Sequence, residues 1–149
     1  MSNQITFKNF DSVKQKILTL IHQSEFIAFD CEFSGLALRE EDEHNIYDSV
    51  EDRYQKIKHM CQNGIIFTLG LSFFIYNSEK DIYEGHPYNF YLFPSTDGMK
   101  GYYSPIFAVT ATSINFLAEH NFDFNKVFKD GIVRILSALC TNFVKSRTK

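Results

Sequence analysis

Residues 26–35 constrain the fold of this chain more than any other stretch, because a short apolar run leads directly into a pair of carboxylates. Residues 26–29 are all apolar, Asp30 and Glu32 follow, and Gly35 closes the run. A short segment that is rich in Phe and Ile and ends at a turn-forming residue is typical of a buried strand. The sequence therefore predicts a buried strand over residues 26–33.

The two carboxylates of this strand are a candidate metal site. Asp30 and Glu32 are two positions apart, so on a strand both side chains point to the same face. Two poorly solvated carboxylates repel each other, and a hard divalent cation such as Mg²⁺ or Mn²⁺ relieves that repulsion. The alternative is a solvated strand end whose carboxylates cap the next turn, and Ser34-Gly35 is good turn chemistry for it.

Length and composition limit the remaining possibilities. A chain of 149 residues is about one ordinary domain, and its net charge of −3 gives no general attraction to nucleic acid. Three widely spaced cysteines form no zinc pattern, so we expect reduced thiols in a protein of the cytoplasm, the nucleus or both. No window is long and apolar enough to span a membrane, and the first residues lack the features of a signal peptide.

The rest of the chain predicts an α/β arrangement in which helices flank a three-stranded antiparallel meander. Apolar residues at helical spacing predict a first helix over residues 8–24. A second helix begins after Ser49 and runs to about residue 61, and helical turns are expected at 112–120 and 122–131. Strands are expected at 26–33, at 65–76 as a central strand covered on both faces, and at 88–93.

Two surface features leave the function open. Residues 36–50 are mostly polar and predict a mobile surface loop with a solvated His44. The second helix carries a basic face of Arg53, Lys56, Lys58 and His59, which is either simply solvated or in contact with phosphates near the metal site. The aromatic side chains are expected to pack mainly in the core; for Phe116, core packing is the favoured role and a stacking surface is the alternative.

Several segments resemble one enzyme family in the same order along the chain. Residues 29–35 resemble the first exonuclease motif of the poly(A)-specific ribonuclease (deadenylase) family, which belongs to the DEDD 3′-to-5′ exonucleases. Further resemblances lie at residues 52–56, 70–71, 89–94, 113–117, 121–128 and 131–132. The resemblance implies an RNase H-like exonuclease fold, of which this chain holds a part.

The resemblance also implies a mechanism and a substrate. Four carboxylates would hold two divalent metal ions, Mg²⁺ or Mn²⁺, and Asp30 and Glu32 match the first two of them. Phe33 and Gly35 would pack against the terminal nucleotide. The implied activity is 3′-to-5′ exoribonuclease action on RNA 3′ ends, either poly(A) tail shortening or small-RNA trimming.

The chain departs from the family pattern after Ile132. The later motifs with two further Asp residues and a His are absent, so only half of the metal ligands are present. We therefore expect residues 1–132 to be the N-terminal half of a ribonuclease domain and 133–149 a divergent tail with the spacing of an amphipathic helix. The alternative function is a catalytically inactive chain that pairs with a second copy or with the full-length nuclease.

Overall fold

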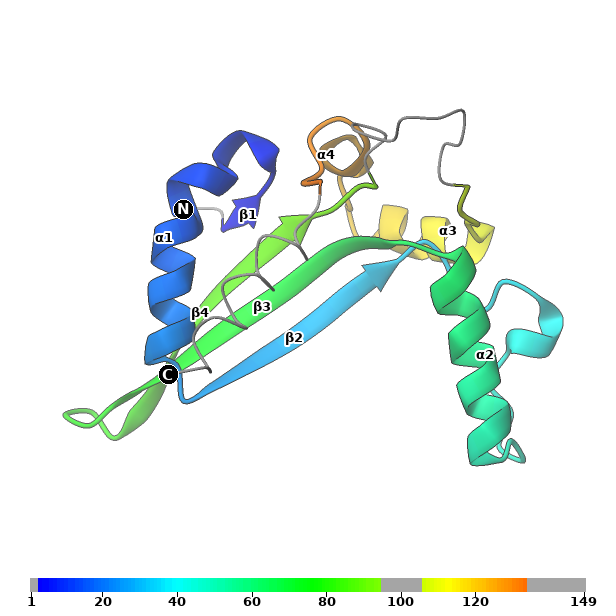
Figure 1. Cartoon of the computed structure of the whole chain (residues 1–149), viewed down its shortest axis with the longest axis horizontal. Helices are drawn as coiled ribbons and strands as arrows, with labels where there is room; N and C mark the ends of the chain where they lie inside the picture. Colours follow the sequence, from blue (N-terminus) through cyan, green and yellow to red (C-terminus); the bar gives the residue numbers. More distant parts are fainter. Residues whose placement is uncertain (1–2, 95–105, 134–149) are drawn as a thin grey trace, which may run out of the picture.

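The computed structural model describes residues 3–94 and 106–133, and a four-stranded sheet lies at its centre (Figure 1). The strand order is β1-β4-β3-β2. The strands are β1 (Gln4–Ile5), β2 (Phe26–Phe33), β3 (Ile66–Asn77) and β4 (Ile82–Tyr91). The helices are α1 (Phe7–Gln23), the short 3₁₀ helix η1 (Glu40–Asp42), α2 (Val50–Asn63), α3 (Ala111–Glu119) and α4 (Phe124–Phe128).

The predicted antiparallel meander is confirmed, because β2 pairs antiparallel with β3 and β3 pairs antiparallel with β4. The pairing places Asp30 opposite Gly70 and Gly70 opposite Asn89, so these three side-chain positions share one face of the sheet. A register shift between Glu32 and Phe33 ends the regular pairing of β2. The face that carries Asp30 is therefore fixed across three strands.

Helix α1 packs against the opposite face of the sheet. Ile17 and Leu20 of α1 are buried there, together with Ile5 of β1, Phe73 of β3 and Phe90 of β4. The helix spans residues 7–23, close to the predicted range of 8–24, because its apolar positions recur at helical spacing. The main core therefore lies between α1 and the strands β1, β4 and β3.

A second core cluster joins the ends of β3 and β4 to α3 and α4. Phe67 and Tyr91 of the sheet are buried against Leu117 of α3 and Val127 of α4. Thr110 caps the start of α3 by accepting a bond from the backbone N–H of Ser113. This packing holds α3 beside the end of β2 that carries Glu32 (Figure 1).

The prediction that residues 26–33 are buried is wrong, although their strand boundaries are right. β2 is the edge strand of the sheet, and Phe29 is 77% exposed. The core cluster under α1 includes residues of β1, β3 and β4 but none of β2. Helix α1 covers the part of the sheet formed by the other three strands, and β2 lies at the far edge. An apolar run alone does not distinguish an interior strand from an edge strand.

The strand over residues 65–76 is central, as predicted, but it is not covered on both faces within the described part of the chain. Phe73 is fully buried under α1, whereas Gly70 and Ser72 on the other face line a hollow of about 440 Å³. Within the described residues, no helix is long and apolar enough to cross a membrane. The predicted tail helix lies almost entirely outside the described residues.

Candidate functional site

The structure places Asp30 and Glu32 near the end of β2, where each of them lines a hollow. Asp30 lines the hollow of about 440 Å³ over Gly70 and Ser72. Glu32 lines a second hollow of about 360 Å³ between β2 and α3, which we call the α3 pocket. Both carboxylates lie on the same face of the sheet, because Asp30 is opposite Gly70 and Glu32 is opposite Thr68.

The electrostatics of this strand end favour a cation. Partial burial raises the pKa of Glu32 above its usual value, the charge of Asp30 raises it further, and His120 acts in the opposite direction. Burial, Asp30 and Glu32 likewise raise the pKa of the Cys31 thiol. Negative potential therefore gathers around residues 30–32, and a positive ion placed there would favour the ionised carboxylates.

Aromatic side chains line the α3 pocket beside Glu32. Phe33 and Leu36 come from the end of β2 and the following turn, and Phe116 comes from α3. Phe116 is 54% exposed, and the centroid of its ring lies 4.3 Å from that of His120. The expectation that Phe116 packs in the core is wrong, because on α3 it is Leu117 that is buried. The pocket therefore offers a flat apolar surface next to a carboxylate.

Ser34 and Gly35 follow the carboxylates in the sequence and are both buried. The Ser34 hydroxyl donates to the carbonyl of Ala108 and accepts the backbone N–H of Ile65, at 2.8 and 2.9 Å. A Cβ added to Gly35 would lie 2.8 Å from side-chain atoms of both Leu38 and Thr110. The close approach that requires glycine is thus to α3 and its own turn, and packing of Gly35 against a nucleotide stays a prediction.

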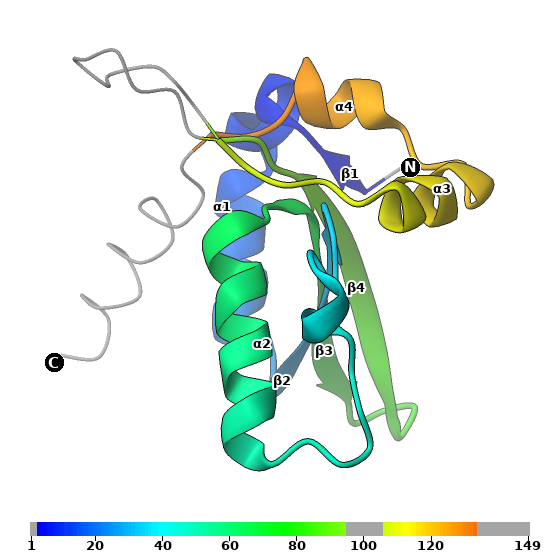
Figure 2. The same ribbon diagram turned by 90° about the vertical axis from the view of Figure 1, so that its right-hand side faces the viewer.

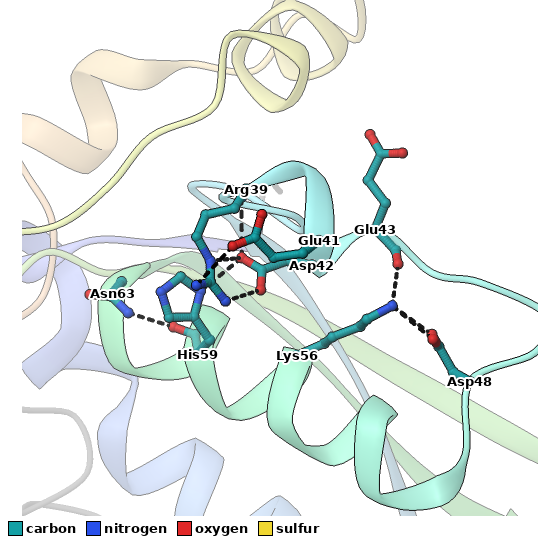
Figure 3. A network of polar contacts seen from close by, with 8 residues as sticks. All are labelled: Arg39, Glu41, Asp42, Glu43, Asp48, Lys56, His59 and Asn63. Carbon is teal, nitrogen blue, oxygen red and sulfur yellow. Dashed lines mark hydrogen bonds and ion pairs between the residues drawn. The ribbon is translucent and has the colours of Figure 1, made fainter.

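The loop between β2 and α2 is fastened to α2 by buried charge (Figure 3). The Asp42 side chain is 1% exposed and accepts bonds from the Arg39 guanidinium at 2.8 and 3.2 Å. Its second partner is His59 of α2, whose Nδ1 lies 2.7 Å from the carboxylate. The hydrogen bonds of Arg39 outweigh the effect of burial and lower the pKa of Asp42 to about 2.

A second ion pair holds the same loop further along. Lys56 donates to both oxygens of Asp48 at 2.8 Å and to the carbonyl of Glu43 at 2.7 Å (Figure 3). Figure 2 shows the loop and its 3₁₀ helix running beside α2. The sequence predicted a loop without such anchors, because no local pattern pairs Asp42 with His59 across 17 positions.

These ion pairs divide the basic face that the sequence placed on α2. Lys56 and His59 contact Asp48 and Asp42, so both side chains hold the loop against α2. Arg53 and Lys58 form no ion pair with any carboxylate of the described residues. Of the four basic side chains on this face of α2, Arg53 and Lys58 are therefore the two without a carboxylate partner among the described residues.

The donor set fits a divalent metal in part. Carboxylate oxygens are the ligands that Mg²⁺ and Mn²⁺ prefer, and Asp30 and Glu32 supply them on one face. Within residues 3–94 and 106–133, no group of three or more His, Cys, Asp or Glu side chains is placed to hold a metal ion. The arrangement therefore supplies two ligand residues, and a complete metal centre requires further oxygen donors.

Comparison with known families gives a match over most of the chain. The family model of the CAF1 family ribonucleases matches residues 5–137. The match includes Asp30, Glu32 and the α3 pocket, and it also includes the loop that Asp42 fastens to α2.

Curated relatives match at the level of sequence. Poly(A)-specific ribonuclease PARN of Xenopus laevis is 36% identical over 133 residues, which cover 87% of this chain and 21% of the relative. The human PARN is 36% identical over 141 residues, 87% of this chain and 20% of the relative. The pre-piRNA 3′-exonuclease trimmer of Bombyx mori is 36% identical over 128 residues, 86% and 24% respectively. The chain thus spans about a fifth of the length of these relatives.

A solved structure matches at the level of the fold. S. pombe Pop2p, in a form bound to Mg²⁺ and Mn²⁺, superposes with a TM-score of 0.61 at 19% sequence identity. The match covers 96% of this chain and 52% of Pop2p. The predicted α/β class and RNase H-like fold are confirmed by this likeness.

Proposed function

The chain belongs to the CAF1 family of ribonucleases, and from that premise we propose that it contributes to hydrolysis of RNA from the 3′ end. The observation that carries the proposal is the placement of Asp30 and Glu32 on one face at the end of β2. Each of them lines a hollow, and Glu32 shares its hollow with the exposed Phe116. A relative named as a 3′-exonuclease trimmer supports this direction of cleavage, and relatives named as poly(A)-specific ribonucleases support RNA as the substrate.

In this proposal, Asp30 and Glu32 hold a divalent metal ion, Mg²⁺ or Mn²⁺. The raised pKa of Glu32 and the proximity of Asp30 are what a site built for a cation shows before the cation binds. When bound, such an ion activates water and stabilises the departing oxygen of a phosphodiester. A complete metal centre in this proposal needs oxygen donors in addition to these two carboxylates. The solved structure of Pop2p in a form bound to Mg²⁺ and Mn²⁺ supports the choice of these metals.

The α3 pocket accepts the last nucleotide of the RNA. Phe33 and Phe116 provide flat apolar surfaces for the base, and base–aromatic stacking contributes about 1–3 kcal/mol per base. The pocket adjoins Glu32, so a base held there brings the terminal phosphodiester next to the carboxylates. The substrate in this proposal is poly(A) or the 3′ end of a small RNA.

A second function is favoured by the exposed edge of β2. Ile27 and Phe29 are 39% and 77% exposed, and within the described residues no strand pairs with the outer edge of β2. Unpaired edges with apolar side chains pair readily with another chain. The chain would then act as a non-catalytic partner of a second copy or of a longer nuclease.

The decisive experiment measures metal binding and RNA shortening by the purified chain. We expect Asp30→Asn and Glu32→Gln each to weaken Mn²⁺ binding, measured by calorimetry, by about tenfold or more, because each removes one anionic ligand. Glu79→Gln is the matched control, since this exposed carboxylate lies in the turn between β3 and β4. Shortening of 5′-labelled oligo(A) should require both residues of the pair.

Three outcomes separate the two functions. Metal-dependent shortening that both substitutions abolish supports the nuclease. Metal binding without shortening favours the partner function, because the carboxylates are then present but catalysis is not. Mn²⁺ binding that neither substitution weakens contradicts the proposed metal site.

A further inference from the structure

The α3 pocket continues into a third hollow that runs along α2. This third hollow, distinct from the one beside Asp30, has a volume of about 440 Å³. It lies between the loop after β2 and the helix α2, and we call it the α2 groove. Leu36, Ala37 and Glu43 line both the α3 pocket and the α2 groove. The two hollows are therefore neighbours on one surface that starts at Glu32 and ends at Arg53.

Among the described Lys and Arg side chains that line the α2 groove, Arg53 is the one that no carboxylate pairs. Asp42 and Asp48 line the groove, but Asp42 is paired with Arg39 and bonded to His59, and Asp48 is paired with Lys56. Arg53 also lines the groove and forms no ion pair with a carboxylate of the described residues. A guanidinium with all its donors available binds phosphate well, often with two parallel hydrogen bonds.

The floor of the α2 groove is apolar. Leu36, Ile57 and Met60 line it. Leu36 is 69% exposed and Ile57 is 58% exposed. An apolar floor beside a cation suits a ligand that combines a flat ring with a phosphate. Glu43, at the junction with the α3 pocket, disfavours a phosphate there and favours a donor such as a hydroxyl or an amino group.

We propose that the α2 groove binds the nucleotide that precedes the 3′-terminal one, with Arg53 holding the phosphate on its 5′ side. The assignment rests on the proposed function, because it takes the terminal nucleotide to occupy the α3 pocket. Arg53 then acts as a binding residue for the substrate strand and makes the chain sensitive to substrate length. Lys58 lies on the same helix but does not line the groove.

The test compares two dinucleotides that differ by a single phosphate. ApA lacks the 5′ phosphate, and pApA carries it, so only pApA presents a group to Arg53. Each would compete with fluorescein-labelled oligo(A) of eight nucleotides for the full chain, in EDTA to prevent hydrolysis, with fluorescence anisotropy as the readout. We expect wild-type protein to bind pApA about tenfold more tightly than ApA, and Arg53→Gln to remove that difference.

Lys58→Gln is the control, because it removes an equal charge from the same helix outside the groove. It should leave the ratio of the two affinities unchanged, and Arg53→Gln should also reduce the salt dependence of oligo(A) binding by about 0.7 in log–log slope. Equal loss for ApA and pApA in Arg53→Gln, or an equal effect of Lys58→Gln, would overturn the assignment. Wild-type protein that binds neither dinucleotide would overturn the proposed function itself.

Discussion

At the scale of single residues, two neighbours on α3 have opposite surroundings. Leu117 is 3% exposed and belongs to the cluster that joins α3 and α4 to the sheet, whereas Phe116 is 54% exposed beside Glu32. Helical periodicity predicts that adjacent positions differ in burial, but it does not say which one faces the core. A large aromatic side chain in the solvent-facing position is the more informative of the two, because burial does not explain it.

The two positions should therefore separate binding from stability. We expect Phe116→Ala to lower the free energy of unfolding by less than about 1 kcal/mol, because the ring is half-exposed, and to weaken oligo(A) binding about tenfold. Leu117→Ala should cost about 2–5 kcal/mol, because it leaves a cavity. Chemical denaturation and anisotropy measure both quantities. Unchanged oligo(A) binding by Phe116→Ala would contradict the role of the α3 pocket.

At the scale of elements, the loop after β2 behaves as a fastened element. Asp42 is the point at which it is held, since its carboxylate binds Arg39 of the loop and His59 of α2 (Figure 3). The loop forms one wall of the α2 groove and carries Leu36 of the α3 pocket. The ion pairs of Asp42 and Asp48 therefore set the shape of both hollows.

Removing the Asp42 charge should loosen this wall. We expect Asp42→Asn to lower the free energy of unfolding near neutral pH by about 2 kcal/mol, because two charge-assisted hydrogen-bond partners lose their anion. The native pKa of about 2 lies below the ordinary value of 3.8. The contribution of Asp42 is therefore complete above about pH 4 and is lost as the pH falls through about 2.

Denaturation of wild type and Asp42→Asn at several pH values checks this expectation. The difference between the two proteins should shrink steadily between about pH 4 and pH 2. Glu41→Gln is the control, because its side chain is 67% exposed and its pair with Arg39 contributes less than about 1 kcal/mol. A difference that is the same at both ends of this range would show that the Asp42 carboxylate is not stabilised by its partners.

The sequence predicted the long elements well and missed those that depend on distant partners. The strand at 26–33 was correct in its bounds because turn signals flank an apolar run. The two-residue strand β1 was missed, since it exists only through parallel pairing of Gln4 and Ile5 with β4. The start of β4 was placed six positions late because His86-Pro87 reads as a turn. Pro87 is tolerated because β1 pairs only with Asn89 and Phe90, further along β4.

At the scale of the whole molecule, the covering of the sheet is uneven. Helix α1 packs on the strands β1, β4 and β3, while β2 forms the edge of the sheet farthest from β1 (Figure 1). That Asp30 and Glu32 share one face of the sheet was predictable because alternation along one strand is a local rule. The α3 pocket and the anchors of the loop were not predictable, because they join positions more than seventy apart, such as Ser34 and Ala108, or pair loop with helix.

The exposed edge should make the purified chain self-associate. We expect sedimentation to show a concentration-dependent increase in mass, and Phe29→Lys to suppress it, because a charge on an edge strand opposes pairing. Phe29 is 77% exposed, so its replacement should change the free energy of unfolding by no more than about 0.5 kcal/mol. Ile46→Lys is the control, because Ile46 is exposed in the loop between β2 and α2 and does not belong to β2. A wild-type chain that stays monomeric at all concentrations would contradict the expectation.

The alternation of side chains along β2 has a consequence for how such a strand can change over evolutionary time. Even-numbered positions 30 and 32 carry the carboxylates, and odd-numbered positions 27 and 29 carry the apolar groups of the opposite face. Substitutions at one parity leave the other parity in place. Substitutions at positions 27 and 29 of this eight-residue strand can therefore change which protein binds its apolar face while both carboxylates are kept. Substitutions at positions 30 and 32 can remove the carboxylates while the apolar face is kept.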